Sequence, residues 1–195
     1  KIVFIRCILM LLFWEEKNMK NKLSIVLSLF LVGFASPLMA NTIKWSMPGD
    51  SLTLDPHAQN EGPTHMVSRQ VYEGLVTHDI NMNIVPQLAT SWEAVDPETW
   101  VFNLRDGVKF HDGSNLTAAD VAFSINRAKT APSDMVDVIE SITSATALDD
   151  LTVEIKTEGP NPILLNQLVQ IFVMSESWSK EMGCELSYKV GRAHV

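Results

Sequence analysis

Alternation of apolar and polar residues is clearest in residues 98–127. Thr99–Leu104 has the period of a half-buried strand, and one of its faces carries Trp100, Phe102 and Leu104. Asp106-Gly107 is a turn pair, because glycine adopts a positive φ without steric cost. Alternation resumes at Val108–Phe110, so the pattern predicts a β-hairpin between these two segments.

A helix start follows this hairpin. His111-Asp112-Gly113 is a second turn, and Thr117 stands three residues before Asp120, the spacing of a capping box. In that arrangement the threonine and the carboxylate satisfy free amide groups of the first helical turn. The sequence therefore predicts a helix from Ala118 to about Lys129.

The remaining pattern predicts short strands interrupted by helices. A helix is expected from His65 to Gly74, where Gly74 would end it, and another over Ile163–Val169 after a Pro-containing start. Thr90–Val95 is expected to pair with the strand at Thr99–Leu104. Further strands are expected at Thr42–Met47, Leu75–Thr77, within Val138–Leu148, at Leu151–Lys156 and at Ile171–Met174. This alternation indicates a mixed α/β fold.

The first forty residues have the pattern of a targeting segment. Residues 19–40 combine a basic start, an apolar run and a small residue, Ala40, that suits signal peptidase, so we expect a secretory signal peptide. The alternative is a membrane-spanning helix, but the apolar run is shorter than the roughly 20 residues that a span needs. Residues 1–18 precede Met19, and we expect either an upstream extension of the reading frame or an unusually long signal region.

The charge of the expected mature chain limits its partners. The whole sequence has 15 basic and 23 acidic residues, and residues 1–40 hold five of the basic and two of the acidic ones. The mature part then has a formal charge of −11, which argues against nucleic acid and anionic membranes as partners. Only Cys184 of the two cysteines would remain, so an intramolecular disulfide is not expected.

No recognisable catalytic or metal-binding pattern stands out. His111-Asp112 suggests a base or a metal ligand, but the other histidines are scattered, and the spacings of zinc, nucleotide and serine-hydrolase motifs are absent from the sequence. We therefore expect structural or surface histidines, no catalytic residues, no cofactor and no metal site. Trp92, Trp100 and Phe102 fit ligand stacking, yet their alternation favours packing in the core.

Five successive motifs carry a resemblance to a known family. They are SLTLDPH (51–57), VYEGLVTHD (71–79), PQLATSWE (86–93), TWVFNLRDGVKFHDG (99–113) and LTAADVAFSINR (116–127). In this order and spacing the chain resembles the family 5 solute-binding proteins of ABC transporters, which bind oligopeptides, dipeptides and, in some branches, nickel or opines.

The resemblance implies an architecture and a role. The fold would be an α/β, type II periplasmic-binding-protein-like lobe with an inserted α+β subdomain, represented here incompletely by residues 41–183, with an atypical tail at 184–195 that indicates truncation or a frameshift. The role would be that of a periplasmic monomer that delivers a peptide or similar solute to an inner-membrane permease with separate ATPase subunits. The alternatives are a non-functional fragment, a chemosensory binding protein and, least favoured, an exported enzyme.

The resemblance also nominates a ligand site. The loop that matches Asn60, Glu61 and Gly62 lines the ligand cleft in the family, so these three residues are the candidate ligand-binding residues. Loops that follow a strand often bind ligands, because their free backbone groups face the ligand without disrupting the core. The alternative is that the three residues form only a solvated loop ahead of a helix.

Overall fold

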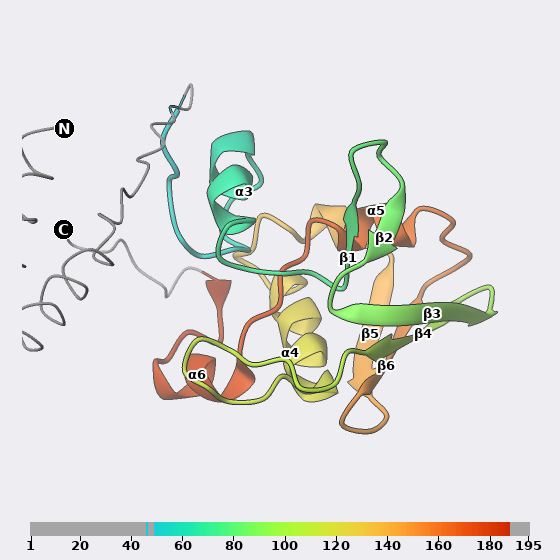
Figure 1. Cartoon of the computed structure of the whole chain (residues 1–195). Coiled ribbons are helices and arrows are strands. Elements are labelled where there is room, and N and C mark those ends of the chain that lie inside the picture. The colour runs from blue at the N-terminus through green and yellow to red at the C-terminus, as the bar shows by residue number, and fades with distance from the viewer. Residues whose placement is uncertain (1–45, 47–48, 188–195) are drawn as a thin grey trace, which may run out of the picture. The chain divides into compact units, whose positions relative to one another are not determined.

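A computed structural model describes residue 46 and residues 49–187 of the chain, and Figure 1 shows how their helices and strands are arranged. The expected upstream extension (1–18) and signal peptide (19–40) lie outside the described residues, as does nearly all of the first strand expected at 42–47. The described residues form a mixed α/β structure, as the sequence pattern predicts. No described helix is long and apolar enough to cross a membrane.

The largest sheet has four antiparallel strands in the order β3-β4-β6-β5. Their bounds are Ala89–Asp96 (β3), Thr99–Leu104 (β4), Thr152–Thr157 (β6) and Ile142–Ala147 (β5). Trp92 of β3 lies opposite Phe102 of β4, which confirms the predicted pairing of these two strands. Phe102 also lies opposite Val153 of β6, so β4 is bonded on both edges.

The hairpin expected between β4 and Val108–Phe110 is wrong. Gly107 does adopt the turn conformation, with a φ of 74°, but the chain then leaves the sheet. The edge of β4 that faces away from β3 pairs with β6 and the residue before it, where the Leu104 amide donates to the Leu151 carbonyl at 2.7 Å. Residues 108–110 form a loop with one isolated bridge between Lys109 and Asn115.

Helix α4 (Ala118–Ala128) covers one face of the sheet by packing on β5 and β6. It begins where the capping-box pattern predicts, because the Thr117 amide donates to the Asp120 carboxylate at 2.9 Å. Its buried apolar face joins the sheet in one hydrophobic core, which includes Val121, Ile125, Phe102, Val153 and Ile155. Trp92 and Trp100 pack against this core, so the prediction of a packing role for these aromatic residues is confirmed.

Helix α3 (Gly62–Ser68) is shorter and begins earlier than the predicted helix His65–Gly74. Pro63 stands in its first turn, where a missing N–H costs nothing, and this favours the earlier start. Gly74 does not end the helix. A Cβ at this position would lie 3.0 Å from the Ile171 carbonyl oxygen, so glycine permits the close approach of two extended segments.

The other elements are short. Strands β1 (Val76–His78) and β2 (Ile84–Pro86) form a separate antiparallel pair, of which the sequence predicted only the first. Residues 171–174 are buried as expected, but they are not a strand, because only Phe172 bridges, to Gly74. The other helices of the described residues are η1 (Asp137–Ile139), the expected α5 (Leu164–Leu168) and an unpredicted α6 (Glu176–Glu181).

Candidate ligand-binding site

Asn60 and Glu61 stand directly before α3, with Glu61 as the extended N-cap residue, and Gly62 is the first residue of the helix. The Thr64 hydroxyl donates to the Glu61 carboxylate and accepts from the Leu52 amide at 3.2 Å. These bonds tie residues 52, 61 and 64 together. Asn60 and Gly62 remain exposed at the rim of the resulting loop, and the space around a Cβ built on Gly62 is open.

Asn60 also contacts the helix that follows it. Its Oδ1 lies 3.3 Å from Nε2 of His65. Burial lowers the pKa of His65 below its ordinary 6.5, and the Arg69 charge lowers it further, while Glu61 opposes the shift. The imidazole is therefore neutral at neutral pH, and an Nε2–H tautomer donates to the Asn60 amide oxygen.

A buried ionic network lies behind this loop and was not predicted from the sequence. Arg127, at the end of α4, makes a two-pronged contact with Asp55, in which Nη1 and Nη2 each lie 2.9 Å from a carboxylate oxygen. Both residues are at most 2% exposed. Arg127 Nη1 also lies 2.9 Å from Nδ1 of His57. Arg127 and Asp55 are 72 residues apart in sequence, so no local pattern indicates their pairing.

His57 is a neutral member of this network. Its burial, and secondarily the charge of Arg127, lower its pKa to about 3. The Nε2 atom lies 3.0 Å from the Phe172 carbonyl oxygen, so Nε2 donates there and the bare Nδ1 accepts from Arg127. This tautomer satisfies both ring nitrogens and keeps a second cation away from the guanidinium.

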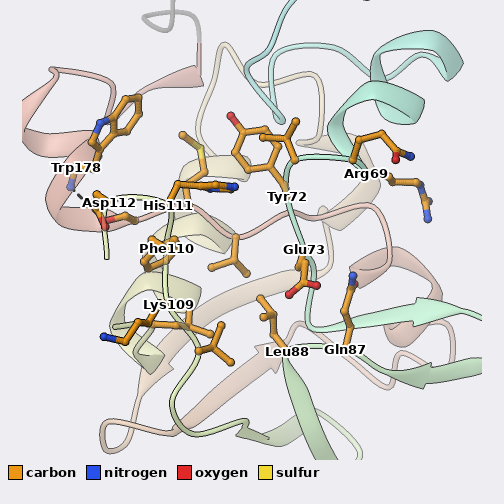
Figure 2. A pocket seen from close by; sticks show the side chains of 17 residues that line it. Arg69, Tyr72, Glu73, Gln87, Leu88, Lys109, Phe110, His111, Asp112 and Trp178 are labelled. Atoms are coloured by element: carbon orange, nitrogen blue, oxygen red, sulfur yellow. Dashed lines mark hydrogen bonds between the residues drawn. The ribbon is translucent and has the colours of Figure 1, made fainter. Parts of the chain in front are cut away.

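A pocket of about 580 Å³, which Figure 2 shows from close by, lies among other described residues, and neither Asp55, His57 nor Arg127 lines it. Aromatic side chains from three separate segments line it, namely Tyr72, Phe110 and Trp178. Charged side chains of both signs stand among them, namely Arg69, Glu73, Lys109 and Asp112. Its volume lies within the roughly 300–1,000 Å³ range of small-molecule sites. Asn60, Glu61 and Gly62 do not line it, so the structure offers two separate candidate sites.

His111 and Asp112 lie at the exposed margin of this pocket. Asp112 accepts hydrogen bonds from the amide and hydroxyl of Ser114, and these bonds lower the pKa of its carboxyl. The carboxylate is therefore committed to the turn that it closes. Among the described residues, no three His, Cys, Asp or Glu side chains gather closely enough to hold a metal ion.

The family of the chain follows from comparison with known proteins. A family model described as bacterial extracellular solute-binding proteins, family 5 Middle, matches residues 83–185, a segment that runs from β2 through α6. The chain belongs to this solute-binding family. The match includes β3, β4 and α4, the elements that the sequence motifs predicted most accurately.

Family 5 relatives are much longer than this chain. The glutathione-binding protein GsiB of Pectobacterium atrosepticum is 33% identical over 138 residues, which cover 69% of this chain and 27% of the relative. The periplasmic oligopeptide-binding protein OppA of Salmonella typhimurium is 33% identical over 136 residues, covering 60% of this chain and 25% of the relative. The chain thus spans about a quarter of the length of these relatives.

Solved structures give the same fold. The binding protein AgaA of A. tumefaciens R10, in complex with agropinic acid, superposes with a TM-score of 0.65 at 28% identity. The match covers 69% of this chain and 28% of that one. The described fold is therefore part of a type II periplasmic binding protein, as the sequence motifs implied.

Proposed function

We propose that this protein is the periplasmic substrate-binding component of an ABC importer and that it takes up a peptide-like solute. The observation that carries the proposal is the continuous family match over residues 83–185. Both relatives described above are named for peptide ligands, GsiB for glutathione and OppA for oligopeptides. The formal charge of −11 expected for residues 41–195 fits a soluble exported protein better than one that binds nucleic acid.

The ligand contacts are proposed for Asn60, Glu61 and Gly62. The exposed Asn60 amide suits a peptide backbone group, and the Glu61 carboxylate suits an ammonium group at a peptide terminus. Gly62 leaves room for a ligand to approach the backbone, because nothing lies within 4 Å of a Cβ built on it. The loop thus combines backbone recognition with a charge for one end of the ligand.

The partners follow from this role. An inner-membrane permease would receive the solute, and separate subunits would hydrolyse ATP. The protein itself would act without catalysis, without a cofactor and as a monomer. Its relatives are named as binding proteins, which supports a binding role in place of an enzymatic one.

Isothermal titration calorimetry tests the substrate class. We suggest a chimera in which residues 41–183 replace the matching part of a full-length relative, titrated with a mixed peptide library, with nickel and with sugars. A peptide-like solute should release heat with a 1:1 stoichiometry. Binding of nickel or a sugar with no heat from any peptide would overturn the proposed substrate class.

A further inference from the structure

We propose that Arg127, with Asp55 and His57, is a positioning residue that fixes the loop Asn60–Gly62 in the shape needed for ligand binding. The inference rests on the proposed function, which assigns ligand contact to that loop. Arg127 itself does not reach the ligand, because its side chain is buried and all its described contacts are internal. Its effect on binding passes through the chain between residues 55 and 65.

Hydrogen bonds to Arg127 and within the segment fix residues 55–57. Both Asp55 oxygens accept from the Arg127 guanidinium, and Asp55 Oδ1 also accepts from the His57 amide at 3.0 Å. Asp55 is thereby fixed in position and in rotation. The chain leaves this anchor at His57 and reaches Asn60 only three residues later.

A second path joins the network to the loop from the other side. His57 bonds the Phe172 carbonyl, and the Phe172 ring lies 6.0 Å from the ring of His65. His65 in turn contacts the Asn60 side chain at 3.3 Å. The loop is therefore held at its beginning by Asp55 and His57, and near its end by His65.

The same network fastens two other segments beside the loop. The His57 carbonyl accepts from the Ser133 hydroxyl at 3.0 Å and from the Asp134 amide at 3.1 Å. Arg127 donates to the carbonyls of Cys184 and Leu186, each at 3.1 Å. The network thus brings together residues 55–57, 133–134 and 184–186, of which the Arg127 guanidinium itself bonds the first and the last stretch.

Only arginine has the geometry for this task. Its planar fork binds both carboxylate oxygens and still directs donors at the His57 ring and at two backbone carbonyls. A lysine ammonium keeps the charge but cannot reach these acceptors together. The conservative change Arg127→Lys therefore separates geometry from charge.

Hydrogen–deuterium exchange of the 195-residue chain tests the proposal without a ligand. In Arg127→Lys, the amides of His57, Ala58 and Asp134 should exchange at least about tenfold faster than in the unchanged protein, whereas the amides of β4 and β6 should keep their protection. The matched control is Ile155→Ala, a core change in β6 that should lower Tm while leaving the exchange of the His57, Ala58 and Asp134 amides as it was. Asp55→Asn is the second variant and should act like Arg127→Lys.

The outcomes distinguish a local role of the network in positioning the loop from a general role in the stability of the fold. Unchanged exchange of the His57, Ala58 and Asp134 amides in both network variants would overturn the proposal. So would an acceleration no larger than that of Ile155→Ala at an equal loss of Tm, or failure of both network variants to fold, since the network would then serve the fold as a whole. Because exchange needs no ligand, a negative result here is distinct from a negative calorimetric result.

Discussion

At the scale of single residues, the buried Asp55–Arg127 pair makes the protein sensitive to the loss of either partner. Removing two charges from water is costly, and their mutual attraction offsets that cost only when the geometry is good and the remaining donors are satisfied. Here both carboxylate oxygens are bonded at 2.9 Å, and three further acceptors take the other donors of Arg127. The pair is therefore stable as a unit and vulnerable to loss of either partner.

The substitution Arg127→Met should lower the free energy of unfolding by about 3–5 kcal/mol, because it leaves the Asp55 carboxylate buried and unpaired. Urea denaturation followed by circular dichroism measures the change. Lys180→Met is the matched control, since it removes an exposed ion pair with Glu176, and should cost less than about 1 kcal/mol. Equal small effects of the two changes would contradict the assignment of a strong buried pair.

His57 should make stability dependent on pH. Its native pKa of about 3 lies below the ordinary 6.5, so between these values the unfolded chain binds a proton that the native protein does not bind. Native stability is therefore lost as the pH falls from about 6.5 towards 3. Relative to His57→Gln, the unchanged protein should lose roughly 2–3 kcal/mol between pH 7 and pH 4.

Urea unfolding of both proteins at several pH values measures this difference. Other groups titrate in the same range, and the comparison with His57→Gln cancels their contribution. Parallel pH profiles for the two proteins would mean that His57 takes up its proton equally well in the folded and unfolded states, which conflicts with its burial.

At the scale of elements, Asp120 links the starts of two helices. Its Oδ2 accepts from the amide and hydroxyl of Thr117, and its Oδ1 accepts from the Glu176 amide at 2.8 Å. One carboxylate thus caps α4 and orients α6, although Asp120 and Glu176 are 56 residues apart in sequence. The structure confirms the capping box predicted from the sequence, and it adds the contact with α6, which the sequence did not predict.

The substitution Asp120→Ala should cost about 2–3 kcal/mol, more than the roughly 1 kcal/mol of an ordinary cap, because the Thr117 and Glu176 amides both lose their acceptor. Thermal unfolding by calorimetry checks the loss. Asp149→Ala is the control, because Asp149 closes only an exposed turn through the Leu151 amide. A cost for Asp120→Ala no greater than that of the control would argue against the bridge to α6.

The sequence predicted elements well where the signals were local. The alternation of β3 and β4 and the cap at Thr117 depend on neighbouring residues, and the structure confirms them. The false hairpin at Val108–Phe110 arose because a turn and an alternating segment do not specify which strand occupies the edge of β4. Helix α6 also has a local signal, since Ser175 caps it by accepting from the Trp178 amide.

The candidate site, like the fold, could be predicted from the sequence only in part. The loop Asn60–Gly62 was nominated from the family resemblance, and its place at the start of a helix needed no long-range information. Its support from Arg127 depends on a contact across 72 residues, which one sequence without an alignment cannot reveal. The pocket walls come from four separate stretches of the sequence, and no local pattern indicates that these stretches meet.

At the scale of the whole molecule, export is the first expectation to test. Cleavage after Ala40 should give a periplasmic protein that begins at Asn41. Expression of the chain in a Gram-negative host, followed by N-terminal sequencing of the periplasmic fraction, measures this directly. A protein that keeps residues 19–40 and stays with the membrane would contradict the signal-peptide interpretation.

Binding of a peptide-like solute by the loop Asn60–Gly62 is open to a calorimetric comparison of two variants. In the chimera that carries residues 41–183, Glu61→Ala is compared with Glu73→Ala, which removes a carboxylate of the same type from the aromatic pocket. We predict that Glu61→Ala weakens peptide binding at least about tenfold, the loss of roughly 1.4 kcal/mol or more expected for a charged contact, and that Glu73→Ala leaves it unchanged. Full affinity in Glu61→Ala together with weakened binding in Glu73→Ala would contradict binding at the loop and would indicate that the ligand binds in the pocket lined by Glu73.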